Sequence, residues 1–151
     1  MQTICEYLEY DHKCCDDLFD KVETSIAKHE WQQAEIEFQH FHAAFIAHLE
    51  GEESIVFPAF GEIFSEAALP IKILCTEHQR IKGIVTRLQD ALHRREPADF
   101  LLHAETLTLL MQQHSQKEEK MLYPLLDRVL SGNTEDIVCA LRKAIDSHTA
   151  A

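Results

Sequence analysis

The chain has 151 residues, of which 46% are hydrophobic, so it is long enough to bury the core of one domain. Its formal net charge of −12 argues against binding to nucleic acids or to anionic membrane surfaces, both of which attract basic proteins. No apolar run approaches the roughly 20 residues of a membrane span. Five cysteines without a Cys-x-x-Cys pair argue against a disulfide framework, so we expect a cytoplasmic protein.

The low content of helix breakers, four Gly and four Pro, predicts an all-α fold in a single domain over residues 1–151. We expect helices over residues 3–28, 32–63, 70–95, 98–131 and, as a short fifth helix, 134–147. Pro70 and Pro97 fall in first turns, where proline is tolerated. Pro58 and Pro124 fall inside helices and predict a kink or an early end there.

Each of the four long helices carries an apolar stripe that one histidine interrupts. In the first helix the stripe passes through Leu8, His12, Cys15 and Phe19, in steps of three and four residues. Such stripes are typical of helices that face a common core.

The two halves of the chain are copies of one helical hairpin, over about 3–63 and 70–131. A shift of 66 positions relates His12 to His78, His48 to His114, Glu52-Glu53 to Glu118-Glu119, and Phe57-Pro58 to Tyr123-Pro124. Two such hairpins predict an up-down-up-down four-helix bundle with an approximate twofold axis.

The repeated polar residues are predicted to meet at one level of this bundle. Residues 48 and 52, like 114 and 118, lie one helical turn apart on the same face. Burying two carboxylates is costly without a positive partner, and no Lys or Arg lies on the stripes at that level. We therefore expect a pair of metal ions, for which iron, manganese, zinc and copper all suit the residue types. The candidate ligands are His12, His48, Glu52, His78, His114 and Glu118. The alternative is a set of six buried groups that only hydrogen-bond to one another.

The pattern resembles the hemerythrin-like (HHE cation-binding) family, in its short single-domain bacterial form, over residues 3–131. The motifs that carry the resemblance are Asp11-His12, His48-x-x-x-Glu52-Glu53, Glu77-His78 and His114-x-x-x-Glu118-Glu119. It implies a non-haem centre of two iron ions (Fe²⁺/Fe³⁺) with a bridging oxo or hydroxo group. The four histidines would be terminal ligands and the two glutamates, Glu52 and Glu118, would bridge. Twofold symmetry would assign His12 and His48 to one iron and His78 and His114 to the other.

The resemblance leaves three functions open, and it does not decide whether the protein is an enzyme. The first is a reactive di-iron protein that handles O₂, NO or peroxide under stress or donates iron in iron–sulfur cluster repair. The second is a reversible oxygen carrier or store, and the third is an iron- or oxygen-sensing binding module. A sensor usually carries an output domain, for which we expect no room in 151 residues. The oligomeric state is open too, with a homodimer as one option.

One departure from the oxygen carriers of the family favours reaction over carriage. The carriers have His-x-x-x-His on the third helix and His-x-x-x-x-Asp on the fourth, whereas here Lys82 follows His78 and Glu119 follows His114 at those spacings. Because a lysine cation cannot donate an electron pair, each iron keeps only two histidines and has an open coordination position.

Three residues near the candidate ligands have roles that the sequence leaves open. Glu53 and Glu119 are rotated by about 100° from the ligand face, so we expect them in the outer sphere or in solvent, with Glu119 as an alternative ligand in place of Glu118. Cys15 lies on the stripe of His12, where it is either an inert buried thiol or part of a route to the metal.

Overall fold

The computed structural model describes residues 2–149, with side chains as far as residue 146, and within this range it is helical without a strand. The predicted all-α fold is therefore confirmed. The helices are α1 (Ile4–Ala27), α2 (Trp31–Gly51), α3 (Phe57–Ile63), α4 (Ala68–His93), α5 (Pro97–Lys117), α6 (Tyr123–Val129) and α7 (Thr134–Thr149). Two π-helical turns, Glu52–Val56 and Glu118–Leu122, join α2 to α3 and α5 to α6, and a 3₁₀ turn, Ser65–Ala67, precedes α4.

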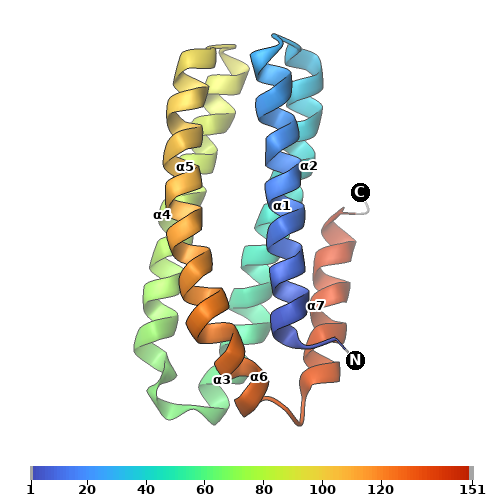
Figure 1. Ribbon diagram of the computed structural model, residues 1–151, viewed down its shortest axis with the longest axis vertical. Coiled ribbons are helices and arrows are strands. Elements are labelled where there is room, and N and C mark those ends of the chain that lie inside the picture. The colour runs from blue at the N-terminus through green and yellow to red at the C-terminus, as the bar shows by residue number, and fades with distance from the viewer. Residues whose placement is uncertain (1, 150–151) are drawn as a thin grey trace.

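The four long helices lie side by side as two hairpins, α1 with α2 and α4 with α5, and both hairpin turns are at the same end (Figure 1). The short helices α3 and α6 lie at the opposite end, and α7 runs back along α2. The two hairpin turns repeat in detail, because His29 and Arg95, 66 positions apart, both have positive φ angles of 57° and 55°. The repeat seen in the sequence thus extends to the backbone.

Neither internal proline ends its helix early. Before Pro58 the chain widens into a π turn, in which the Phe57 N–H donates to the Glu52 carbonyl, and before Pro124 the Tyr123 N–H donates to the Glu118 carbonyl. Proline has no N–H, and its ring displaces the carbonyl four residues earlier, so a wider turn accommodates it without a break. Both π turns begin at one of the two candidate bridging glutamates.

The apolar core consists of two clusters at the two ends of the bundle. The end with the hairpin turns is filled by residues such as Phe19, Phe38, Phe45, Leu88 and Phe100. The other end is filled by residues such as Leu8, Val56, Phe60, Leu126 and Leu141, the last from α7. The buried histidines and glutamates lie between the two clusters, so apolar side chains separate them from both ends of the molecule.

Two further predictions concern the cysteines and the possibility of a membrane-spanning helix. All five cysteines are free, as expected without a disulfide framework. Among the described residues, no helix combines the length and the apolar character that crossing a membrane requires.

Candidate metal centre

The structure brings all six sequence-predicted candidate ligands to one level of the molecule. They come from α1, α4, and the ends of α2 and α5 where the π turns begin. Each is buried: the exposed fraction is 0% for Glu52, His78 and Glu118, 2% for His114, 3% for His48 and 7% for His12. Burial of this many ionisable groups requires close electrostatic partners.

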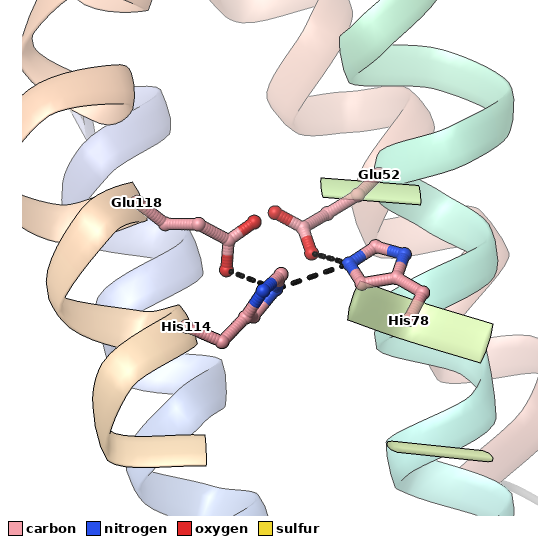
Figure 2. A group of neighbouring side chains, drawn as sticks. All are labelled: Glu52, His78, His114 and Glu118. Carbon is pink, nitrogen blue, oxygen red and sulfur yellow. Dashed lines mark hydrogen bonds and ion pairs between the residues drawn. The ribbon is translucent and has the colours of Figure 1, made fainter. Parts of the chain in front are cut away.

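The six residues form two overlapping groups whose donor atoms could each hold one metal ion. The first group contains Glu52, His78, His114 and Glu118 (Figure 2). Here the Nε2 atoms of His78 and His114 are 3.1 Å apart. The His78 Nε2 atom lies 3.4 Å from Glu52 Oε1, and the His114 Nε2 atom lies 3.2 Å from Glu118 Oε1.

The second group contains His12, His48 and Glu118. The His12 Nε2 atom lies 3.4 Å from Glu118 Oε1, and the His48 Nε2 atom lies 3.4 Å from Glu52 Oε1. The two imidazole rings have their centroids 4.5 Å apart. Glu118 belongs to both groups, whereas Glu52 belongs to the first group only.

These separations fit metal coordination. Two donor atoms about 2.1 Å from one ion, at angles of 90–109°, lie roughly 3.0–3.4 Å apart. The observed distances between inward-facing atoms, 3.1 to 3.4 Å, fall in this range. Four of the six residues have a buried atom without a hydrogen-bond partner among the described residues. One is the outward Nδ1 atom of His12, and the other three are on the inward side: His48 Nε2, Glu52 Oε1 and Glu118 Oε2. Such unpartnered electron pairs, aimed at one place, suit a cation and disfavour a set that only hydrogen-bonds to itself.

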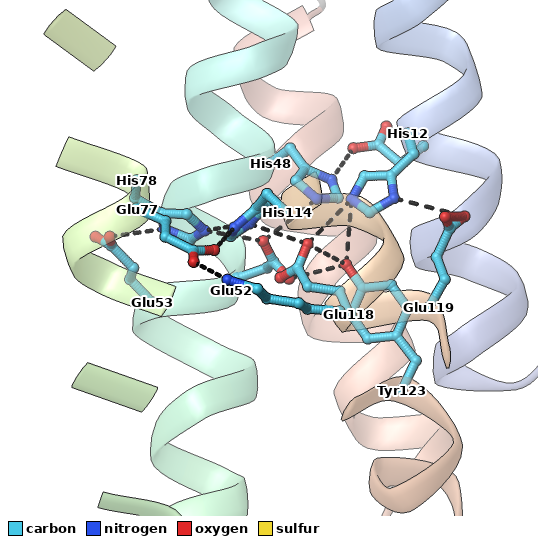
Figure 3. Close-up of polar contacts among 12 residues, drawn as sticks. His12, His48, Glu52, Glu53, Glu77, His78, His114, Glu118, Glu119 and Tyr123 are labelled. Atoms are coloured by element: carbon cyan, nitrogen blue, oxygen red, sulfur yellow. Dashed lines mark hydrogen bonds and ion pairs between the residues drawn. The ribbon is translucent and has the colours of Figure 1, made fainter. Parts of the chain in front are cut away.

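A ring of carboxylates surrounds the histidines on their outer nitrogen atoms (Figure 3). The Nδ1 atom of His48 is 2.6 Å from Asp11, and that of His114 is 2.8 Å from Glu77. An Nδ1–H that donates to a carboxylate leaves the Nε2 electron pair free to face inward. This is the tautomer that a metal-ligating histidine needs.

Glu53 and Glu119, 66 positions apart, lie beside the outer nitrogen atoms of the other two histidines. Glu53 lies 2.9 Å from the Nδ1 atom of His78, and Glu119 lies 3.8 Å from the Nδ1 atom of His12. Both side chains are partly exposed, at 28% and 34%. Glu53 therefore contacts the outer nitrogen of His78, whereas Glu119 stands farther from that of His12, and their outer-sphere role stays a prediction.

Sequence reasoning missed the phenol of Tyr123, which reaches into the middle of the site (Figure 3). Its oxygen lies 2.9 Å from Glu52 Oε2, 3.1 Å from Glu118 Oε1 and 3.2 Å from His12 Nε2. Phe57 occupies the equivalent position of the first hairpin and stacks on His78, with ring centroids 5.9 Å apart. The mismatch between Phe57 and Tyr123 in the repeat was the signal that could have identified it.

The two buried carboxylates strongly perturb each other. Burial and the charge of Glu52 raise the pKa of Glu118 to about 8. Burial also opposes ionisation of Glu52, but hydrogen bonding from Glu118 and the neighbouring His48 outweigh it and lower the pKa of Glu52 well below its usual value. Without a metal ion, Glu52 and Glu118 together therefore hold one proton and one negative charge.

The pKa values of His114 and His12 shift in opposite directions because their neighbours differ. Burial opposes protonation of His114, but hydrogen bonds to Glu118 and Glu77 outweigh it and raise its pKa to about 9. Burial and the nearby His48 lower the pKa of His12 to about 4. His12 thus presents a neutral imidazole, the form that binds metals.

A pocket of about 440 Å³ lies beside the His12 side of the site, between α1 and α5. Its lining includes Cys15, Phe19, Met111 and Glu119. Cys15 is buried, and burial raises the pKa of its thiol, which keeps it protonated. The thiol is thus buried and lines a pocket that Glu119 also lines, and its place on a route to the metal stays a prediction.

Comparison with known families gave a match. The family model described as the hemerythrin HHE cation binding domain matches residues 69–148, which cover the second hairpin and most of α7. Comparisons with curated proteins and with solved structures gave no match. The matched region includes His78, His114 and Glu118 of the repeated set, and it spans more than half of the chain, so the chain belongs to the hemerythrin HHE cation-binding family.

Proposed function

We propose that the protein binds two iron ions between the two hairpins. In this proposal His12 and His48 hold one ion, His78 and His114 hold the other, and Glu52 and Glu118 bridge them. The observation that carries it is the convergence of four inward Nε2 atoms and two buried carboxylates, with unpartnered atoms on His48, Glu52 and Glu118. Membership of a cation-binding family supports it independently.

The same proposal includes the finer architecture. We take the four long helices as one up-down-up-down bundle in a single domain over residues 1–151, with an approximate twofold axis that passes between the two metal positions. The recurrence of the hairpin turns and π turns after 66 residues supports this symmetry. Five free cysteines support a reducing compartment such as the cytoplasm.

We further propose that the centre reacts with O₂, NO or peroxide and does not carry oxygen reversibly. An iron pair, when bound, supplies redox electrons and coordination positions for such small ligands. Lys82, where the carriers have a histidine one turn after the residue equivalent to His78, belongs to neither ligand group, which favours an open position at the ion held by His78 and His114. Donation of iron to damaged iron–sulfur proteins and a sensing role are alternatives that share this centre.

The surrounding residues have separable tasks in this scheme. The carboxylates on the Nδ1 atoms, among them Asp11 and Glu77, hold the imidazoles in one tautomer and orientation. The two apolar clusters keep bulk water away from both ends of the site. The pocket lined by Cys15 and Glu119 offers small molecules an approach on the His12 side.

The test has two stages. Protein made in iron-sufficient cells and purified without added metal should contain close to two metal ions per chain, mostly iron, as measured by elemental analysis. The reduced protein is then mixed with O₂ or NO in a stopped-flow spectrometer, where it should react irreversibly, while Glu118→Ala protein serves as the metal-depleted control. A folded protein with one ion or none would refute the di-iron centre. A spectrum that forms with O₂, disappears on degassing and returns on re-exposure would favour the carrier.

A further inference from the structure

Tyr123 breaks the twofold symmetry of the site, and its hydroxyl is placed like a metal ligand. We propose that the phenol oxygen of Tyr123 is a seventh protein ligand, bound to the metal ion on the His12 and His48 side. The inference rests on the di-iron centre proposed above. It makes the two metal positions chemically different, since the equivalent residue of the first hairpin, Phe57, has no donor atom.

The distances support coordination. The Tyr123 oxygen lies 3.2 Å from His12 Nε2 and 3.1 Å from Glu118 Oε1. These are the separations expected between two ligands of one ion, roughly 3.0–3.4 Å, and they match those within the two ligand groups. His12 and Glu118 both belong to the second group, so the phenol extends that group by one oxygen.

Hydrogen bonding alone does not account for this environment. A phenol has one proton, yet the Tyr123 oxygen faces two carboxylate oxygens and an imidazole nitrogen at 2.9–3.2 Å. One of these acceptors can receive the proton, and the proton that Glu52 and Glu118 share can serve a second contact. With the Nε2 atom of His12 unprotonated, as a metal ligand requires, the third contact has no donor. A cation among these atoms satisfies them together. Tyr123 is fully buried, with an exposed fraction of 0%, so water does not relieve the conflict from outside.

Phe57 shows what the fold requires at this position without a hydroxyl. It is buried, follows the same π turn 66 residues earlier, and packs its ring on His78. An aromatic ring is therefore sufficient for packing at this place in the hairpin. The additional oxygen in the second hairpin has no equivalent packing role.

The step itself would be the exchange of a metal-bound water molecule for the phenolate. A bond would form between the phenol oxygen and the metal ion while the bond to the water oxygen and the phenol O–H bond break, and the water and the proton would leave to solvent. No electron changes hands.

The experiment uses the whole protein loaded with iron(III), because a phenolate bound to iron(III) gives an intense visible charge-transfer band. We expect this band in the natural protein, its loss in Tyr123→Phe and its retention in Tyr10→Phe, whose ring is exposed at 64%. The double variant Tyr123→Phe/Phe57→Tyr should regain the band, because its new tyrosine would bind the metal ion on the His78 and His114 side. Metal content is measured on every sample, and resonance Raman spectra with ring-deuterated tyrosine identify the phenolate without any variant.

The outcomes separate this inference from the di-iron proposal. Two iron ions per chain in the natural protein, without a phenolate band or tyrosine Raman modes, would overturn the seventh ligand and leave the di-iron centre standing. Absence of bound metal would overturn both. Persistence of the band in folded, iron-loaded Tyr123→Phe would also refute the assignment to Tyr123.

Discussion

The two hairpins carry the same candidate ligands in different surroundings. In the second hairpin Lys117 forms an ion pair with Glu77, the carboxylate behind His114, and both side chains reach solvent. In the first hairpin the position of Lys117 is taken by Gly51, where an added Cβ would lie 3.2 Å from Leu141 of α7. The absence of a side chain at Gly51 allows α7 to pack beside Glu52, and Asp11, the carboxylate behind His48, is buried.

This difference shows which parts of the repeat have diverged. The inward histidines and glutamates, the π turns and the carboxylates on the Nδ1 atoms recur at 66-residue intervals. What differs is the covering of each half: a solvated lysine and Phe57 ring on the His78 side, and helix α7 and the Tyr123 phenol on the His12 side. We infer that the two ligand groups are alike in their histidines and unlike in their electrostatic environment.

The largest expected effect comes from removing one of the two buried glutamates. Glu118 belongs to both ligand groups, so Glu118→Ala should lose both ions. Glu52→Ala should lose at least the ion held by His78 and His114. Glu53→Ala is the matched control, because Glu53 contacts only the outer nitrogen of His78, and it should keep most of the metal. Elemental analysis of the purified variants measures this. If Glu119→Ala emptied the site while Glu118→Ala stayed loaded, the bridging scheme would be wrong.

A smaller effect should distinguish the two outer carboxylates. Substituting an outer partner typically weakens metal binding by about 10–100-fold. We expect Asp11→Asn to lie near the upper end and Glu77→Gln near the lower end, because Asp11 is buried at 2.6 Å from His48 while Glu77 shares its charge with Lys117. Competition with a chelator gives the affinities, and Asp17→Asn, on the exposed face of α1, should leave them unchanged. Equal losses of metal affinity in both variants would mean that the packing of α7 beside this part of the site does not influence metal binding.

The smallest effect is a pH dependence of the chelator-treated protein. The pKa values of Glu118 and His114 are raised in the folded state, to about 8 and about 9, so the folded protein holds these protons more tightly than the unfolded chain. Their contribution to stability is present at and below about pH 4.5 for Glu118 and about pH 6.5 for His114, and is lost by about pH 9. His12 has a pKa lowered to about 4, so it destabilises the folded state as the pH falls, but only below about pH 6.5.

Thermal unfolding should therefore shift down by a few degrees between pH 6.5 and 9 in the metal-free protein. The loaded protein should not show this decline, because metal binding displaces the same protons and strengthens with pH. His114→Gln should flatten the metal-free curve. A melting temperature that rises over this range without metal would contradict the assignment of the shared protons.

The helices and the meeting of the six polar residues could be predicted because both depend on local periodicity. His48 and Glu52 share a face through the helical repeat itself, and the 66-residue shift places His114 and Glu118 beside them. All six do lie together, although their role as ligands stays a prediction. The all-α fold followed from the same spacing and from the scarcity of breakers.

The features that escaped prediction depend on contacts between helices. Asp11 approaches His48 from the neighbouring helix, 37 positions away, and no spacing rule within one helix specifies that contact. Pro58 predicted a disturbance, but whether a helix breaks or widens into a π turn depends on how the surrounding helices hold it. Tyr123 was treated as the counterpart of Phe57, since an aromatic stripe gives no indication that one hydroxyl points inward.

Neither hairpin contains a complete ligand group, because each group takes residues from both. This has a consequence for the order of folding. Contacts within a hairpin join residues close in the chain and form early, whereas Glu52 and Glu118 meet only when the two hairpins dock. Docking brings the two carboxyl groups together, so that without a metal ion one of them must take up a proton. A cation captured at that moment takes the place of this proton and lowers the barrier of the final assembly step. The protein is thus expected to complete its folding faster in the presence of its metal.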